Sequence, residues 1–258
     1  MKKGLLHALC LLLAVAGYSQ SVIDSTRTVL RSPDGNLMVQ FYQKRLSDEK
    51  RAMYYVVTYK SKPVIGESLM DIQLNNSLSE KAMGLKVNSH AHWCENLRMV
   101  KVTTESKDLV WTPVNGERSG IKDRYNEALI GLMKDDNPIY TMNVEIRAYN
   151  EGVAFRYFFP ENPKGTYYRV VAENTEFHLP DNTLGWFANW GQGPYSLLPL
   201  RDWPGESERP LTLQLKDGLW VSLAEGAMVD YSRTKFRLST VSPNTLVTSM
   251  HDPADLIS

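Results

Sequence analysis

Two stretches of alternating apolar and polar residues meet at a short turn past the middle of the chain. Before the turn, apolar residues stand at every second position from Met142 to Ala148, and after it they recur from Val153 to Phe159. This period of two predicts a β-hairpin with one face in a core, joined by Asn150-Glu151-Gly152. A hairpin is not stable alone in water, so the rest of the chain must supply further strands.

The charges of this hairpin predict its register. Pairing Ala148 with Phe155 sets apolar side chains opposite one another, whereas a slip of one residue would turn an arginine into the core. In this register Arg147 lies opposite Arg156 on the second face, where like charges repel, so Glu145 is expected to lie between them. The glycine of the turn is expected at positive φ, as part of a β-bulge.

Further strands are predicted along most of the chain. Short β-branched and aromatic runs alternate with clusters of Gly, Pro, Asn and Asp, and no stretch shows a sustained helical period. This pattern predicts an all-β, antiparallel sandwich rather than alternating strands and helices. The other predicted strands are residues 37–42, 53–59, 64–74, 98–105, 109–114, 125–133, 167–172, 176–179, 211–215 and 219–224.

The composition excludes several kinds of partner. The 258 residues carry a formal net charge of zero and are 43% hydrophobic, which is a globular composition with room for one large β domain or two small ones. A surface for nucleic acid or for an anionic membrane would need an excess of basic residues, which this chain does not have. No internal apolar run is long enough to cross a bilayer, so no transmembrane segment is predicted.

Residues 1–20 have the features of a secretory signal peptide. Two lysines precede an apolar run over residues 5–16, and small and polar residues follow. We therefore expect this segment to be removed and the protein to be periplasmic or secreted, with a lipoprotein anchor at Cys10 as the less favoured alternative. Removal would leave Cys94 as the single cysteine, and an exported protein without a disulfide suits a bacterial periplasm or cell surface.

The sequence offers one weak candidate for a metal site. His90 and His92 would share one side of a strand, where two imidazoles could hold a metal ion. A third ligand is missing nearby, which favours a polar surface strand instead. Motifs for a nucleophilic serine or a phosphate-binding loop are also absent from the sequence.

Carboxylates are stronger candidates for chemistry. Glu117, Asp123 and Glu127 lie in one segment, and two of them would serve as general acid and base if their loop folded back on itself. The alternative that we favour is that Glu117 and Glu127 pair with the basic residues at position 118, 122 or 124 and hold the loop against the sheet. The same interpretation applies to Glu208 and Glu225.

The most specific chemical signal is a segment rich in aromatic residues. It interleaves Trp186, Trp190 and Tyr195 with glycines and with the amide side chain of Gln192. Aromatic rings stack on the apolar face of a pyranose, and amides bind its hydroxyl groups. These four residues are therefore predicted to bind carbohydrate, with a buried strand position as the favoured alternative for Trp186. The segment lies in a strand-poor region, residues 180–210, and loops of that length are often functional.

Several motifs follow one another between residues 31 and 232. They are Ser32-Pro33-Asp34-Gly35, Lys62-Pro63-Val64-Ile65, Trp111 with Gly116-Glu117 and Asp123-Arg124-Tyr125-Asn126-Glu127, the hairpin residues 145–157, Glu173-Asn174-Thr175-Glu176-Phe177, and residues 210–232. In this order the set resembles the N-terminal domain of glycoside hydrolase family 97. The resemblance covers most of the chain that follows the predicted signal peptide.

The resemblance implies both a fold and an activity. Members of this family combine an N-terminal β-super-sandwich of the galactose-mutarotase type with a central (β/α)₈ barrel and a small C-terminal β domain. They are exported bacterial α-glucosidases and α-galactosidases that use calcium, and their catalytic residues lie on the barrel. For this chain the resemblance implies a signal peptide over residues 1–20 and an N-terminal domain over residues 21–258. Such a domain would bind carbohydrate or shape the sugar cleft and would be inactive by itself. Its implied partners are an α-glucan or α-galactoside and a barrel encoded in the same gene.

The sequence departs from the family at two places. The family's N-terminal domain lends one acidic side chain to calcium, but the corresponding positions here are Pro194, Tyr195 and Ser196, with no carboxylate before Asp202. Residues 251–258 resemble no part of the family, which predicts that the last strands of the sandwich are missing and a sheet edge is unpaired. Two alternatives remain, a free-standing carbohydrate-binding module and a structural remnant of a truncated gene.

Overall fold

The computed structural model describes residues 27–47, 50–85, 87, 92–135, 137–161, 168–229 and 231–250. In this part of the chain nearly all regular structure is β-strand, and the paired strands run antiparallel. The predicted all-β antiparallel sandwich is therefore confirmed. No helix in these ranges combines the length and the apolar character that a membrane span requires. The predicted signal peptide and residues 251–258 lie outside the described residues.

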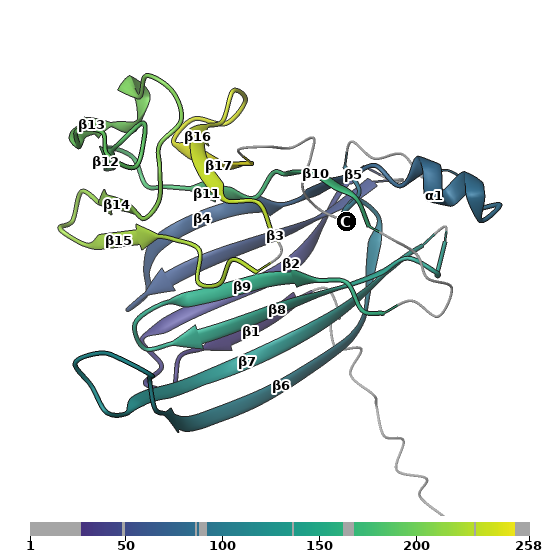
Figure 1. Cartoon of the computed structure of the whole chain (residues 1–258), viewed down its shortest axis with the longest axis horizontal. Coiled ribbons are helices and arrows are strands. Elements are labelled where there is room, and N and C mark those ends of the chain that lie inside the picture. The colour runs from purple at the N-terminus through teal and green to yellow at the C-terminus, as the bar shows by residue number, and fades with distance from the viewer. Residues whose placement is uncertain are drawn as a thin grey trace, which may run out of the picture.

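Two large sheets form the main body of the protein (Figure 1). Their strands are β1 Arg27–Arg31, β2 Leu37–Ser47, β3 Lys50–Tyr59, β4 Lys62–Met70, β6 Leu97–Trp111, β7 Ile121–Lys134, β8 Thr141–Tyr149 and β9 Val153–Phe158. One sheet has the order β1-β2-β3-β4 and the other has the order β6-β7-β8-β9. The two sheets pack face to face, and between them the rings of Tyr55 and Phe155 meet with their centroids 5.4 Å apart.

Three smaller sheets lie beside this main body (Figure 1). Their strands are β5 Ile72–Leu74, β10 Val170–Glu173, β11 Glu176–His178, β12 Leu184–Phe187, β13 Ser196–Pro199, β14 Leu211–Gln214, β15 Trp220–Leu223, β16 Thr234–Leu238 and β17 Thr245–Met250. The sheets have the orders β10-β5, β11-β17-β16 and β13-β12-β14-β15. The helices are α1 Ser77–Ala82 and the 3₁₀ helix η1 Leu200–Asp202. Residues 180–210 thus hold two strands, β12 and β13, that the sequence does not predict, because glycines and prolines interrupt their short alternation.

The central hairpin is confirmed, but its predicted register is wrong by two residues. Phe155 lies opposite Ile146, not opposite the residue two positions further along the chain. A shift of two residues keeps every side chain on its own face, so the apolar alternation does not distinguish the two registers. The observed register places Arg156 opposite Glu145, which replaces a repulsive pair with an attractive one. The prediction of positive φ at Gly152 is also wrong, because the glycines with positive φ are at other turns.

The expected acid between the two arginines is present. The carboxylate of Glu145 lies 2.6 Å from Nη2 of Arg156 and 2.8 Å from Nη2 of Arg147. Arg147 also reaches Glu127 on the neighbouring strand β7, 2.8 Å away. This row of alternating charges lies on the face of the sheet away from the core, so the hairpin is a framework element.

Candidate functional site

The hairpin of β12 and β13 carries the aromatic segment. Trp186 on β12 lies opposite Leu197 on β13, so the two side chains share one face of this small sheet. The other face is buried, because a Cβ added to Gly185 would come within 2.5 Å of the Trp203 ring. Trp186 is half-buried on the outer face, whereas the sequence favours a buried strand position for it.

The loop between β12 and β13 presents the other predicted residues to solvent. Trp190 and Tyr195 expose 63% and 60% of their surface, and Gln192 is exposed as well. The N–H of Gly193 donates to the carbonyl of Trp190 at 2.9 Å and closes a turn. A Cβ at Gly193 would lie 2.0 Å from Cδ1 of Trp190, so the indole lies directly against this glycine. The turn therefore depends on glycine for space.

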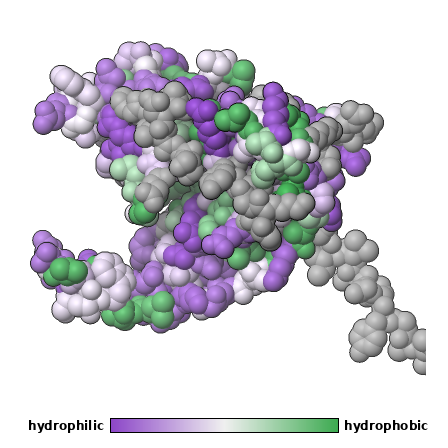
Figure 2. All heavy atoms as spheres, turned by 45° about the vertical axis from the view of Figure 1, so that its right-hand side comes forward, coloured by the Kyte–Doolittle hydropathy of each residue, from purple (hydrophilic) through white to green (hydrophobic). Residues whose placement is uncertain are grey.

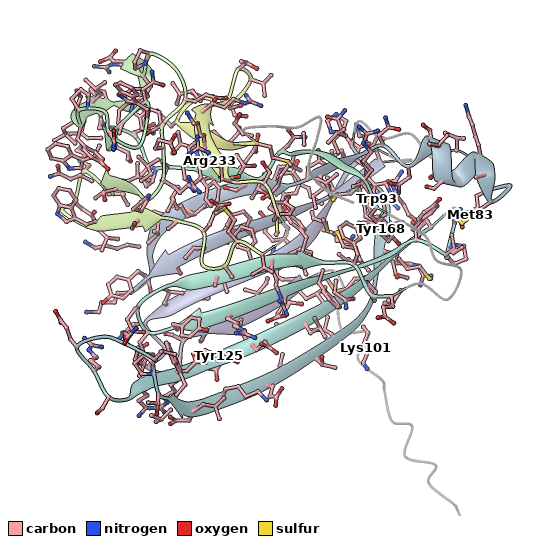
Figure 3. All side chains as sticks on the ribbon, in the orientation of Figure 1. Met83, Trp93, Lys101, Tyr125, Tyr168 and Arg233 are labelled. Atoms are coloured by element: carbon pink, nitrogen blue, oxygen red, sulfur yellow. The ribbon has the colours of Figure 1, made fainter. Side chains whose placement is uncertain are left out.

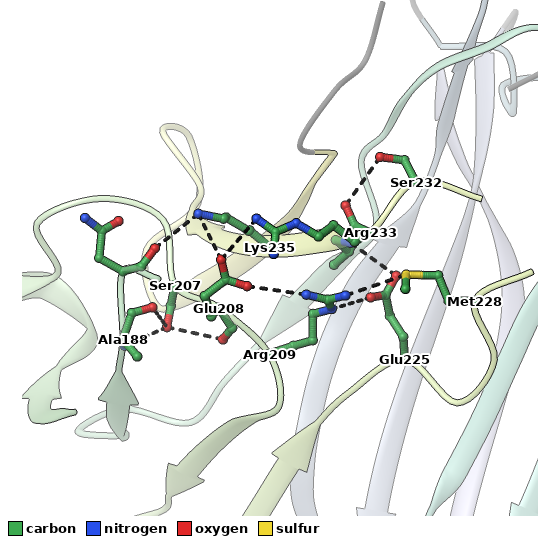
Figure 4. Close-up of polar contacts among 11 residues, drawn as sticks. Ala188, Ser207, Glu208, Arg209, Glu225, Met228, Ser232, Arg233 and Lys235 are labelled. Carbon is green, nitrogen blue, oxygen red and sulfur yellow. Dashed lines mark hydrogen bonds and ion pairs between the residues drawn. The ribbon is translucent and has the colours of Figure 1, made fainter. Parts of the chain in front are cut away.

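Hydrogen bonds from two other segments hold the start of this loop (Figure 4). The N–H of Glu208 donates to the carbonyl of Ala188 at 2.7 Å, and the N–H of Ala188 donates to Oγ of Ser207 at 3.2 Å. Lys235 on β16 donates from Nζ to the carbonyl of Asn189 at 3.1 Å. The backbone immediately before the exposed turn is therefore held in place from outside the hairpin.

A buried group of charges supports these contacts (Figure 4). The carboxylate of Glu208 lies 3.1 Å from Nζ of Lys235, 3.3 Å from Nη1 of Arg209 and 3.4 Å from Nη2 of Arg233. Glu225 contacts the other side of the Arg209 guanidinium. We call these five residues the Glu208 cluster. The side chain of Glu208 is only 7% exposed, so its charge needs the cations around it. Glu208 and Glu225 thus form ion pairs, as the sequence favours.

The sequence does not predict that the Glu208 cluster holds the aromatic loop in place. Its residues come from three separate segments, and only strand pairing around β16 brings them together. A sequence signal does exist, because acidic residues are followed closely by basic ones between Glu206 and Arg209 and again between Glu225 and Lys235. That signal does not say which acid meets which base.

A pocket of about 390 Å³ lies at the opposite end of the β12–β13 hairpin. It is lined by Asp181, Asn182, Thr183, Leu184, Pro199, Leu200, Arg201 and Asn244. None of the four residues predicted from the sequence is among them. The aromatic loop is therefore an exposed platform and does not form a wall of this pocket.

Comparison with known proteins places this fold and this chain in a family. The sequence pattern described as "Glycosyl-hydrolase 97 N-terminal" matches residues 30–253. The chain belongs to glycoside hydrolase family 97. Among curated proteins, a retaining alpha-galactosidase from Bacteroides thetaiotaomicron is 25% identical over 182 residues, which are 70% of this chain and 22% of that protein. The resemblance drawn from the ordered motifs is confirmed.

Solved structures agree with the family 97 fold. A family 97 enzyme from Pseudoalteromonas sp. strain K8, in complex with acarbose, matches with a TM-score of 0.72 at 23% identity, over 86% of this chain and 32% of that one. A beta-arabinopyranosidase matches with a TM-score of 0.65 at 22% identity, over 86% of this chain and 35% of that one. The family 97 chain described here thus spans about a third of these structures and about a fifth of the curated relative.

The donor groups near the aromatic loop of this family 97 domain do not fit calcium. Calcium prefers several oxygen ligands, with carboxylates among them. The first acid after Tyr195 is Asp202 on η1, which is more than half exposed and whose carboxylate lies 3.7 Å from Nε of Arg201. In the ranges that the structure describes, no three His, Cys, Asp or Glu side chains come together as a metal site would need. No calcium ligand is therefore assigned to this domain.

Of the three acids singled out from the sequence, Glu127 forms an ion pair in the described structure, but not with a predicted partner. Glu127 lies opposite Arg147 of β8 and contacts it. Lys122 and Arg124 lie 3.7 Å and 3.4 Å from Asp108 on β6. Strand pairing selects these partners, whereas the prediction relied on closeness along the chain.

The histidine segment is not the polar surface strand that the sequence favours. His92 lies in a turn, with Nδ1 3.0 Å from Oδ2 of the buried Asp71. Trp93 and Cys94, which follow it, are buried in the core. Burial raises the pKa of the Cys94 thiol well above its usual value, so this cysteine is not a reactive thiolate at neutral pH. His90 lies outside the described residues.

Proposed function

We propose that this domain binds carbohydrate through the aromatic loop and helps to shape the sugar cleft of an exported α-glycosidase. The observation that carries the proposal is the exposure of Trp190 and Tyr195, at 63% and 60%, on a loop that the Glu208 cluster holds in place. Exposed aromatic rings beside an amide suit a pyranose, because its C–H face stacks on the ring and its hydroxyl groups bind the amide. A loop that is already ordered loses little conformational entropy when a ligand binds.

The relatives support an α-linked oligosaccharide as the ligand. The Pseudoalteromonas enzyme has been crystallised with acarbose and with panose, and the Bacteroides relative is named as an alpha-galactosidase. We therefore propose an α-glucan or an α-galactoside for this chain. A catalytic barrel would supply the hydrolytic residues, and calcium would belong to that barrel. Export to the periplasm or the medium rests on the signal-peptide features of residues 1–20.

Removal of the exposed indole is expected to weaken sugar binding. In calorimetric titrations with malto-oligosaccharides at millimolar concentration, Trp190→Ala should lower the affinity about tenfold, because the stacking surface is lost. Trp220→Ala is a matched control, since Trp220 is 52% exposed on β15 and lies outside the aromatic loop. Absence of heat with the unsubstituted chain, or equal losses in both variants, would contradict the proposal.

A methyl group at the turn should have a similar effect without removing the ring. Gly193→Ala would drive Cβ into the Trp190 indole, so we expect weaker oligosaccharide binding and an altered tryptophan fluorescence spectrum. Gly191→Ala is the control, because a Cβ there meets no atom within 4 Å. Both variants should change the free energy of unfolding by less than about 1 kcal/mol, since Gly191 is exposed and the indole that must move away from Gly193 is itself 63% exposed. Unchanged binding in Gly193→Ala would show that the orientation of the indole is unimportant.

A free-standing binding module is the second candidate, and the same exposed platform favours it. The two candidates differ in whether a barrel is encoded with this domain. Sequencing the gene beyond the codon for Ser258 separates them. An in-frame (β/α)₈ barrel would support the cleft-shaping function, and a stop codon would support the module.

A further inference from the structure

Strand β6 is a long sheet edge. It spans 15 residues, and in the described part of the chain its one strand partner is β7. From Lys101 to Trp111 it pairs with residues 121–131 of β7 residue by residue, without a bulge. Figure 1 shows β6 along the lower rim of the molecule. Its outer backbone N–H and C=O groups can therefore pair with another strand.

The same strand also leaves apolar side chains uncovered. Strand β1 of the opposite sheet contacts β7 and β8. On β6 the side chains of four apolar residues stay exposed, by 39% at Val102, 53% at Leu109, 70% at Val110 and 50% at Trp111. Figure 2 shows green, apolar patches at the lower left of the molecule, among hydrophilic residues. Exposed apolar surface next to an open sheet edge is a feature of protein interfaces.

We propose that β6 pairs with β6 of a second copy of this chain, antiparallel about a twofold axis at Ser106. Such an interface is self-complementary, because each contact between two residues occurs twice, once on either side of the axis. In this register Val102 faces Val110 of the second copy. Glu105 faces Lys107 of the second copy, and Lys101 faces Trp111 of the second copy. The result is one continuous eight-stranded sheet across the dimer.

The charges of β6 favour this register over two nearby ones. A twofold axis at Thr104 would set Lys101 opposite Lys107, and an axis at Glu105 would set that residue opposite itself, so like charges would repel in both. Within one chain Lys107 already contacts Glu105 on the same face. Pairing about Ser106 joins two such pairs into a ring of four alternating charges. Axes between residues are excluded, because they would place opposite faces of the two sheets side by side.

Sedimentation equilibrium of the full chain over a range of concentrations tests this proposal. We expect a reversible dimer of the unsubstituted chain. Glu105→Lys and Lys107→Glu should each raise its dissociation constant by at least about tenfold, because two attractive pairs become repulsive. The double variant with both reversals should regain the original affinity, since its charges are again complementary. Lys216→Glu, an exposed reversal in the β14–β15 turn, should leave the dimer unchanged.

Each other outcome would overturn the proposal. A chain that stays monomeric at every concentration has no such interface. A dimer that is insensitive to both single reversals uses another surface, and a double variant that stays weak shows that the two charges do not face each other. Circular dichroism of each variant verifies the fold, and the rescue by the double variant separates interface effects from folding effects. The proposal does not depend on sugar binding.

Discussion

Glu208→Ala is expected to lower the free energy of unfolding by about 3 kcal/mol. The substitution removes one carboxylate from the centre of the Glu208 cluster and leaves Arg209 and Lys235 close together, with side chains only 18% and 11% exposed. Arg209 keeps its contact with Glu225, but Lys235 loses its carboxylate partner, and a buried cation without a counter-ion carries an uncompensated desolvation cost. Urea denaturation would show the loss as a lower midpoint at an unchanged slope.

A surface ion pair provides the control for this prediction. Glu67→Ala breaks the pair with Lys44, whose two side chains are 44% and 48% exposed, and should cost less than about 1 kcal/mol. The Glu208 variant should also lose sugar affinity, because Lys235 would no longer be held beside the carbonyl of Asn189. Equal costs for the two substitutions would mean that the Glu208 cluster contributes no more than an exposed pair.

Trp93→Ala is expected to lower the free energy of unfolding by about 3–5 kcal/mol. The side chain is fully buried, and its ring packs edge-on against Tyr140, Phe159 and Tyr168 with centroids 6.4, 5.6 and 5.9 Å away. Figure 3 shows Trp93 and Tyr168 close together in the interior. Truncation would open a large cavity between rings that belong to separate segments, and these segments cannot all close around it.

Thermal and urea denaturation of Trp93→Ala measure this loss, with Trp220→Ala as the matched control. Trp220 is 52% exposed, so its truncation should change the free energy of unfolding by no more than about 0.5 kcal/mol. A Trp93 variant as stable as the control would mean that the aromatic cluster is loosely packed. The comparison separates the loss of a core residue from the general effect of removing an indole.

The aromatic loop shows how far sequence reasoning reaches for the candidate site. Trp190, Gln192 and Tyr195 are recognised from residue type and from the glycines around them, and the structure exposes all three. The Lys235 contact that holds the loop was not predicted, because this residue is distant along the chain. The half-buried position of Trp186 was missed for a related reason: whether a face of a short strand is covered depends on what packs against it.

The sequence by itself determined the strand-rich fold class, the family and the faces of the central hairpin. These follow from local patterns, since apolar alternation assigns a residue such as Ile146 to one face whatever its partner is. Tertiary structure alone decided the two-residue register, in which Arg156 meets Glu145, and the gathering of the Glu208 cluster. The physical reason is that a strand pattern repeats every two residues, so it leaves several registers with the same buried face. Only contacts between distant segments, above all those between charges, choose among them.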